Sequence, residues 1–157
     1  MDKWLTKCVQ CGSDKLRETR STETRTVGGV EFTAELDALK CGKCGETYVE
    51  DKSLEKMELA IAAELGRLGV LKGEAFKFMR KAVGLRGIDL AELLDVTGDT
   101  VSRWERETVP IDHAAFAVLG ALASEARRGG TEMRDRLQAA RDAKLPKKPV
   151  KVVVSAA

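Results

Sequence analysis

Apolar residues recur three or four positions apart through most of the chain beyond residue 50, a spacing that predicts amphipathic helices. Glycines, prolines and small polar residues interrupt the pattern where one helix should end and the next begin. Ser53, Thr97, Asp112 and Thr131 stand where they can cap four of these helices. We expect helices at residues 53–68, 74–83, 88–95, 98–106, 114–126 and 131–143.

An alternating pattern precedes the helices. Residues 16–27 are rich in threonine and alternate in character, Gly28 and Gly29 can form a tight turn, and apolar residues alternate again from Val30 to Leu36. Alternation places every second side chain on one face of a strand, and a glycine pair permits the left-handed backbone of a two-residue turn. The sequence therefore predicts a β-hairpin.

Two similar cysteine motifs bracket the hairpin. Cys8 and Cys11 belong to one C-x-x-C-G motif, and Cys41 and Cys44 belong to the other. Each motif lets one tight turn direct two sulfurs at the same ion, and the hairpin brings the two turns together. Four thiolates favour tetrahedral Zn²⁺ over iron, the alternative metal. Four free buried thiols are the other interpretation, but the paired spacing argues against it.

Four sulfurs would fill the coordination shell of zinc, which favours a structural site over a catalytic one. The single histidine, His113, is expected at a helix start and cannot build a second metal site alone. The sequence contains no phosphate-binding loop or nucleophile arrangement, so we do not expect an enzyme. RNA recognition is a further alternative, yet near the cysteines only Trp4 and Tyr48 offer a ring for base stacking.

Residues 86–107 carry the most specific functional pattern. Thr97 can cap a helix on which Val101 and Trp104, three positions apart, face inward. Small polar residues and arginines are left on the outer face, as in a helix that enters the major groove of DNA. The residues that we expect to contact DNA are Thr97, Gly98, Asp99, Thr100, Ser102, Arg103 and Arg106.

Within this set, Arg103 and Asp99 are expected to read bases, because arginine can bind guanine bidentately and aspartate can accept from cytosine. A solvated helix arginine is the alternative for Arg103. Glu105 is expected to form an ion pair within the domain. Contacts to the DNA backbone are expected from Thr97, Thr100, Ser102 and Arg106.

Residues 90–105 resemble the helix-turn-helix of Cro/repressor-type proteins of the Xre family, in the pattern Leu-Ala-x-x-Leu-x-Val-x-x-x-Thr-Val-Ser-Arg-Trp-Glu. Three positions nearby depart from the family. Gly87 stands where a phosphate-contacting glutamine is frequent, and Asp95 and Glu107 stand where glycine is usual. A single module of this kind binds weakly, so we expect a homodimer that reads two half-sites about one helical turn apart.

The order of the modules provides a second resemblance. A C-x-x-C motif, a hairpin insert, a second motif, a connecting helix and an Xre-type domain together resemble the MqsA family of type II antitoxins, with its YgiT-type zinc finger. This resemblance implies that Cys8, Cys11, Cys41 and Cys44 bind one structural Zn²⁺ per chain. It also implies that the zinc domain binds a cognate toxin, and that the second domain dimerises, binds operator DNA and represses its own operon.

The net charge of +2 is unevenly distributed. Residues 131–157 contain seven Lys or Arg against three Asp or Glu, which leaves −2 for the rest of the chain. We expect a solvated basic tail, with auxiliary phosphate contact as the alternative. The sequence has no apolar run of about 18 residues and no apolar stretch after its first Met, so we expect a cytoplasmic protein without a membrane segment and without disulfides.

These patterns predict an α+β fold in four segments. Residues 1–50 form a small zinc-bound β-hairpin domain, and 51–72 form a connecting helix. Residues 73–128 form an all-α, five-helix repressor-type helix-turn-helix domain, and 129–157 form a C-terminal helix and basic tail. The predicted function is a DNA-binding antitoxin that represses its own operon and neutralises a toxin. The alternative is a stand-alone zinc-containing transcriptional regulator without a toxin.

Overall fold

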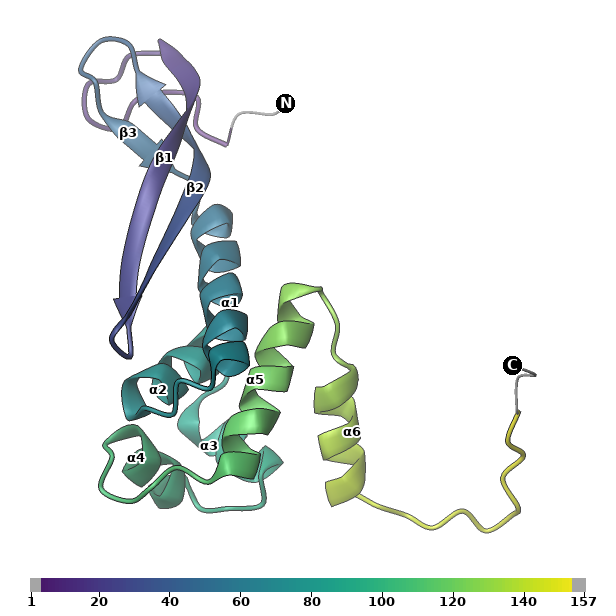
Figure 1. The fold of residues 1–157 in the computed structure, drawn as a ribbon. Helices are drawn as coiled ribbons and strands as arrows, with labels where there is room; N and C mark the ends of the chain where they lie inside the picture. The colour runs from purple at the N-terminus through teal and green to yellow at the C-terminus, as the bar shows by residue number, and fades with distance from the viewer. Residues whose placement is uncertain (1–3, 154–157) are drawn as a thin grey trace.

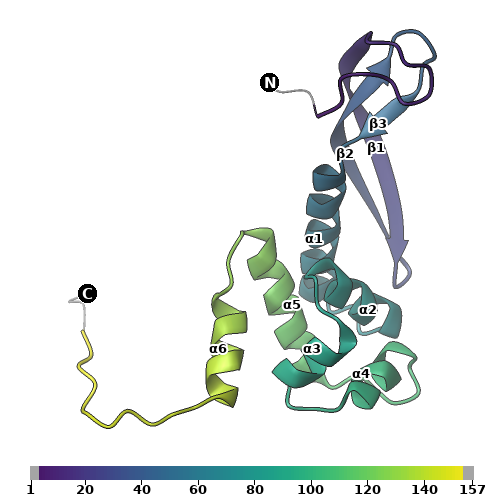
Figure 2. The same cartoon turned by 180° about the vertical axis from the view of Figure 1, so that it is seen from behind.

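The computed structural model describes residues 4–153 and has the predicted α+β class (Figures 1 and 2). Within these residues, a three-stranded antiparallel sheet of order β1-β2-β3 precedes six helices. The predicted segments 1–50 and 129–157 each extend beyond the described residues. The elements are β1 Leu16–Val27, β2 Val30–Cys41, β3 Thr47–Val49, α1 Asp51–Leu68, α2 Gly73–Ala82, α3 Gly87–Leu93, α4 Gly98–Glu105, α5 His113–Arg127 and α6 Glu132–Arg141.

Strands β1 and β2 form the predicted hairpin. Their antiparallel register pairs Leu16 with Cys41 and continues without interruption to the turn. Gly28 (φ 61°) and Gly29 (φ 81°) both adopt the left-handed conformation required by a two-residue turn that joins twisted strands. Because the register is fixed from the turn onward, β2 delivers Cys41 to the place where β1 began, next to the first cysteine motif.

Strand β3 is absent from the sequence prediction. It pairs antiparallel with the end of β2, and Tyr48 lies opposite Leu39. Three residues are too few to show an alternating pattern, so this strand is visible only through its partner. It matters because it holds Tyr48 beside the cysteines.

Each predicted helix is present within the described residues, and each of its ends lies within two positions of the prediction. Helix α1 begins at Asp51 with Glu50 as N-cap, and no side chain caps it, so the predicted Ser53 cap is wrong. The reason is the short connection from β3. Glu50 alone is extended between strand and helix, and the first helical turn therefore forms before Ser53.

Of the other three predicted helix caps, two form and one does not. Thr97 and Asp112 each accept the backbone N–H three residues on, at 3.1 Å and 2.8 Å, and cap α4 and α5 as predicted. Thr131 precedes α6 but caps nothing. Its backbone is not extended (ψ 3°), and its hydroxyl donates to Asp135 at 3.0 Å instead.

Helices α1 to α5 and the tip of the hairpin share one hydrophobic core. Phe76 on α2 is fully buried, and the ring of Trp104 on α4 lies edge-on to it, with 5.7 Å between ring centroids. Val27 brings the hairpin tip into the same core. Helices α1 and α5 cross so closely that a Cβ atom on Gly66 would lie 2.7 Å from the Cα atom of Gly120. The hairpin and the helices thus form one connected body.

Helix α6 lies against α5 and α3, and residues 142–153 beyond it are exposed and form no helix or strand. In the described part of the chain, the helices are too short or too polar to cross a membrane.

Candidate metal centre and nucleic-acid interface

The two cysteine motifs fold into matching turns. Gly12 N–H donates to the carbonyl of Cys8 at 2.8 Å, and Gly45 N–H donates to the carbonyl of Cys41 at 3.0 Å. Both glycines are left-handed, with φ values of 69° and 82°, a conformation that a side chain would strain. Each turn therefore presents its two cysteines to one point.

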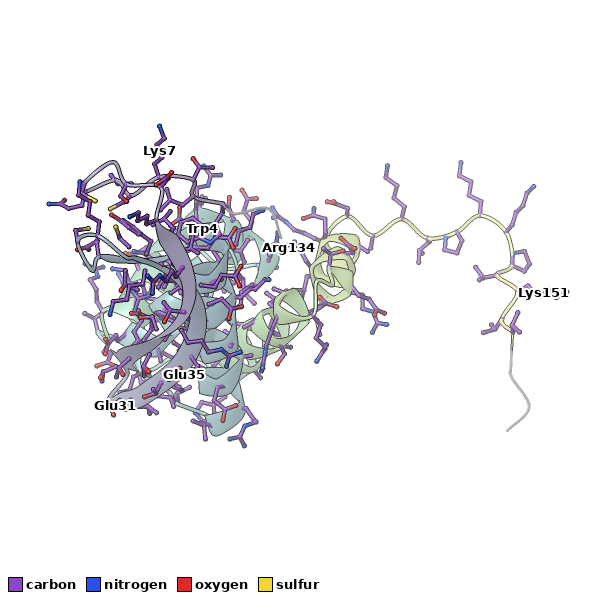
Figure 3. All side chains as sticks on the ribbon, turned by 90° about the horizontal axis from the view of Figure 1, so that it is seen from above. Trp4, Lys7, Glu31, Glu35, Arg134 and Lys151 are labelled. Atoms are coloured by element: carbon purple, nitrogen blue, oxygen red, sulfur yellow. The ribbon has the colours of Figure 1, made fainter. Side chains whose placement is uncertain are left out.

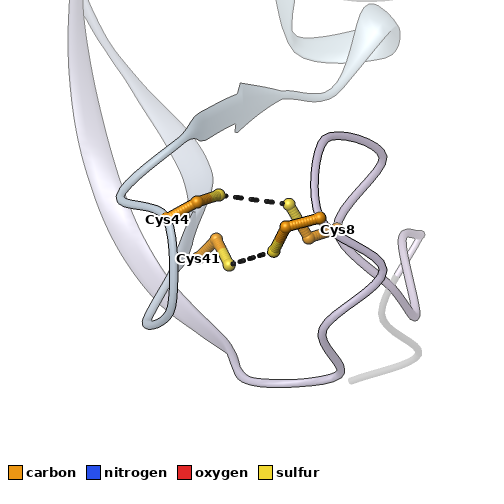
Figure 4. Close-up of side chains that lie close together, drawn as sticks. Cys8, Cys41 and Cys44 are labelled. Atoms are coloured by element: carbon orange, nitrogen blue, oxygen red, sulfur yellow. Dashed lines mark hydrogen bonds between the residues drawn. The ribbon is translucent and has the colours of Figure 1, made fainter.

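The four sulfurs meet at that point (Figure 4). All four Sγ atoms lie within 4.8 Å of one another, with 3.5 Å between Cys8 and Cys44 and 3.7 Å between Cys11 and Cys41. Sulfurs bound to one tetrahedral zinc lie about 3.8 Å apart, because each Zn–S bond is about 2.3 Å long. None of the four is in a disulfide. The cluster could hold a single metal ion, and four sulfurs would leave no open coordination position.

Hydrogen bonds and desolvation move the pKa values of the Cys8 and Cys44 thiols in opposite directions. The hydroxyl of Tyr48 lies 3.2 Å from the Sγ atom of Cys8 and lowers the pKa of that thiol to about 6. At Cys44 the backbone N–H of Glu46 lowers the pKa, but desolvation and hydrogen bonds with the other three cysteines outweigh it and raise the pKa to about 12. Neighbouring thiolates repel one another, so all four ionise together only around a cation.

Tyr48 also ties β3 to the first cysteine motif, because its hydroxyl accepts the N–H of Gln10 at 3.2 Å. In the second motif, Lys43 N–H donates to the Sγ atom of Cys41 at 3.4 Å. Such outer contacts orient metal ligands and tune their basicity. The sequence indicated Tyr48 only as an aromatic residue near the cysteines, since its contact with Cys8 depends on the pairing of β3.

Helices α3 and α4 lie at the opposite end of the molecule from the cysteines (Figures 1 and 2). The connection between them covers residues 94–97. Leu90 and Ala91 on α3 and Val101 and Trp104 on α4 are all buried, as the sequence predicts for Val101 and Trp104. Since both helices bury one face in the main core, their relative position is fixed.

The outward face of α4 carries the residues predicted to contact DNA. Asp99, Arg103 and Arg106 are exposed, and Thr100 and Ser102 are partly buried. Arg103 Nε lies 2.8 Å from a carboxylate oxygen of Asp99, one helical turn earlier. The two residues expected to read bases are therefore paired with each other.

Several of the other predicted residues take part in local hydrogen bonds. The hydroxyl of Thr97 accepts the amide of Thr100 at the start of α4, and the two hydroxyls lie 2.9 Å apart. Arg106 Nε donates to the carbonyl of Ser102 at 3.2 Å. Gly98 begins the helix and is partly buried. These contacts shape the two ends of α4.

Two contacts to α2 fix the far end of α4. Glu105 pairs with Arg80 at 2.5 Å, with the two side chains only 12% and 10% exposed, and this confirms that Glu105 pairs within the domain. Glu107 accepts the N–H of Gly73 at 2.7 Å. The sequence analysis did not predict that Arg80 is the partner of Glu105. Its position four residues after Phe76, on the apolar side of α2, is the signal that indicates a buried arginine.

Comparisons with known proteins yield no match. No family model matches the chain, and the searches of curated proteins and of solved structures also find nothing similar. The two family resemblances therefore rest on motif residues alone, and the function has to be inferred from the geometry of this chain.

Proposed function

We propose that the chain is a sequence-specific DNA-binding protein in which α3 and α4 form a helix-turn-helix and α4 enters the major groove. The observation that carries this proposal is the exposed polar face of α4, whose opposite face is anchored by buried Val101 and Trp104. The Arg80–Glu105 ion pair fastens the last turn of the same helix to α2. A short, rigidly seated helix with exposed arginines suits a groove that admits one helix.

Arg103 and Asp99 act as one base-reading unit in this proposal. Asp99 engages Nε of Arg103. We assign the terminal Nη1 and Nη2 atoms of Arg103 to guanine O6 and N7. The carboxylate of Asp99 also repels phosphate, which weakens binding wherever the correct bases are absent. Thr97, Thr100, Ser102 and Arg106 support this unit with backbone contacts.

Two backbone conformations support the resemblance to Xre-type domains. Asp95 (φ 54°) and Glu107 (φ 58°) are the two non-glycine residues with positive φ in the described part of the chain. They occupy the two positions where the family usually has glycine, which adopts this conformation without strain. The chain keeps the expected turn geometry with different residues. Residues 73–128, predicted to hold five helices, contain four, α2 to α5. We infer that they form an all-α repressor-type domain that binds DNA as a homodimer.

Selection from a random-sequence DNA pool tests this proposal. The wild-type protein should enrich a duplex with two half-sites about 10 base pairs apart. Arg103→Ala should lose about 1–3 kcal/mol of discrimination at one base pair of each half-site. Arg67→Ala is the matched control, because Arg67 is also an exposed helix arginine paired with a carboxylate, that of Glu64. No enriched sequence, or an unchanged base preference for Arg103→Ala, would contradict the assignment.

We further propose that Cys8, Cys11, Cys41 and Cys44 bind one structural Zn²⁺ and that the centre is not catalytic. Thiolates select zinc among the common divalent ions, and four of them close its shell. When bound, the ion supplies a cross-link between the two cysteine turns. Metal analysis of the purified full chain should give one zinc per chain, and Cys41→Ser should lower that stoichiometry. A full complement of iron would overturn the choice of metal.

The wider role that we propose is that of an antitoxin, in which the zinc domain binds a cognate toxin and the DNA-binding domain represses the shared operon. Support comes from the order of the modules, which resembles that of MqsA-type antitoxins. The cysteines and α4 also lie at opposite ends of the molecule, so two partners can bind without overlap (Figure 1).

Pull-down of the tagged full chain from its own cells, with mass spectrometry, tests this role. A stoichiometric small protein encoded by the adjacent gene is the expected partner. If promoter DNA alone is retained, the better account is the alternative function, a stand-alone zinc-containing regulator without a toxin.

A further inference from the structure

A tight reversal after α5 returns the chain to the end of the molecule that carries α3 and α4. Gly129 has a left-handed φ of 76°, and Gly130 N–H donates to the carbonyl of Glu125 at 3.0 Å. The carboxylate of Glu125 accepts the N–H of Met133 at 2.8 Å, in the first turn of α6. As a result, α6 runs back alongside α5 and ends at the level of α3 (Figures 1 and 2).

Helix α6 is fastened in this position. Met133 and Leu137 are partly buried against the main core. Arg134, which Figure 3 shows beside the helical body, donates to the carbonyl of Val83 at 3.0 Å. Arg141 at the end of α6 lies 3.5 Å from a carboxylate oxygen of Glu92 on α3. That exposed ion pair contributes little to stability. The packing of α6 nevertheless places its C-terminal end, after which residue 142 follows, beside α3.

Residues 142–153 follow from this point, and we name them the lysine segment. They contain four lysines and a single acid, Asp142, whose carboxylate already accepts the side-chain amide of Gln138 at 2.6 Å. Among the described residues, none of the four lysines forms an ion pair. Figure 3 shows the segment extending from the helical body toward Lys151. The lysines are Lys144, Lys147, Lys148 and Lys151.

Two prolines keep the lysine segment from continuing α6 as a helix. Pro146 and Pro149 lack a backbone N–H and disfavour helix in the residues before them. The apolar side chains of the segment do not pack against the helices either, since Leu145 is 92% exposed. Twelve extended residues span up to about 40 Å, enough to follow many phosphates of a duplex.

We propose that the lysine segment is an arm that binds the phosphate backbone of DNA flanking the sequence read by α4. This inference rests on the proposed DNA-binding function. Its grounds are the start of the segment beside α3, its excess of lysines without an ion pair and its extended form. Lysines that bind phosphate release counterions and add affinity without adding base preference.

The test compares the salt dependence of DNA binding by the wild-type full chain with that of a variant in which the four lysines are replaced by glutamine. The probe is the duplex that the wild-type protein enriches from a random pool, with its flanks retained. The slope of log affinity against log salt should decrease by about 0.9 for each phosphate that the variant no longer neutralises, up to about 3.6 per chain. The selected base sequence should stay the same.

A matched control removes the same charge outside α3, α4 and α6. It replaces four exposed lysines by glutamine, two close in sequence to the first cysteine motif and two in the first turns of α1, and it should leave the salt slope unchanged. These lysines are Lys7, Lys15, Lys52 and Lys56. Trimming the duplex to the sequence contacted by α4 should reduce the wild-type slope to that of the lysine-segment variant.

Two results would overturn the arm while leaving the DNA-binding proposal intact. One is an unchanged slope in the lysine-segment variant, and the other is an equal decrease in the control. If the wild-type protein binds no duplex, the proposed function fails and the arm fails with it.

Discussion

Two regions of the molecule are stabilised in different ways. The cysteine end holds the four cysteines, and the helical body consists of α1 to α5 with the hairpin tip. In residues 4–153, twenty buried residues from α1 to α5 and the hairpin tip form the core of the helical body. At the cysteine end four buried residues cluster, Cys8, Leu16, Leu39 and Cys41, and two of them are candidate metal ligands. Apolar burial contributes about 25 cal/mol per Å². The helical body can therefore hold itself together, whereas we expect the cysteine end to depend on a metal bound by its cysteines.

Metal removal should separate the two regions most strongly. Apparent binding free energies of structural zinc are about 10–16 kcal/mol, so chelation or Cys41→Ser should unfold the cysteine end. Hydrogen exchange read by mass spectrometry should show reduced amide protection there and unchanged protection in α2 to α5. Lys43→Gln, an exposed side chain in the same turn, is the control and should keep the metal. Loss of protection throughout the chain would show that the two regions are not separate.

Phe76→Ala makes the converse change. Removing this fully buried ring should cost about 3–5 kcal/mol of unfolding free energy in urea, because a cavity opens against Trp104. Phe78→Ala is the control, since Phe78 is only partly buried, and the loss should be smaller. Both variants should still bind one zinc per chain under native conditions. A folded Phe76→Ala protein without zinc would be evidence against independent stabilisation.

The hairpin tip is where the two regions meet. Gly28 N–H donates to the Glu74 carboxylate at 2.9 Å, and a Cβ atom on Gly28 would lie 2.9 Å from a methyl carbon of Val70. Gly29 has the same left-handed backbone but would meet only the flexible end of Lys72. Gly28→Ala should therefore cost about 1–3 kcal/mol more than Gly29→Ala. Equal losses in urea unfolding would mean that the close approach of Gly28 to Val70 contributes nothing.

The two left-handed residues of the described helical body that are not glycine, Asp95 and Glu107, differ in their hydrogen bonds. Asp95→Gly should stabilise the protein by about 1 kcal/mol, because glycine removes the strain of a positive φ. Glu107→Gly relieves the same strain but removes the carboxylate that accepts the Gly73 amide, so its net effect should be close to zero. Urea unfolding of both variants checks the difference. A destabilised Asp95→Gly protein would rule out strain at that turn.

The smallest expected effect is confined to acid pH. A hydrogen bond from the Arg86 side chain, together with the Arg86 backbone N–H, lowers the pKa of Asp89 from 3.8 to about 2. The ionised form is favoured in the folded state. Its contribution to stability is therefore complete above about pH 4 and is lost as the pH falls toward 2.

Asp89→Asn should flatten the decline in unfolding free energy across that interval, measured by urea titration at several pH values. Asp14→Asn, an exposed change at the cysteine end, should leave the decline as it is in the wild type. If the unfolding free energy of Asp89→Asn declines as much as that of the wild type, Asp89 is not the source of the decline.

The features that local sequence predicted well are those that depend on neighbouring residues. The Gly28-Gly29 pair determines the hairpin turn, and each C-x-x-C-G motif forms its own turn. The cap at Thr97 also forms within four residues. Because the hairpin register follows from the turn, the approach of the two cysteine motifs was predictable as well. Whether Arg103 reads DNA remains a prediction. Its ion pair with Asp99 was not predicted, although a spacing of four residues on a helix permits one.

The features that were missed depend on residues distant in sequence. Strand β3 exists because β2 offers it an edge, and the proximity of Tyr48 to Cys8 follows from that pairing. Ser53 and Thr131 have the right side chains for capping but the wrong backbone. A cap requires an extended residue directly before the helix, and the connection to the preceding element decides where that residue lies.

DNA binding after metal removal is the most direct test of this division of the molecule. The full chain is stripped by a chelator, and its affinity and base preference for the selected duplex are compared with those of the zinc-loaded protein. We predict that both are unchanged while the cysteine end loses amide protection, since α4 is seated by Val101, Trp104 and the Arg80–Glu105 pair. Loss of DNA binding on metal removal, with recovery when zinc is restored, would contradict this account.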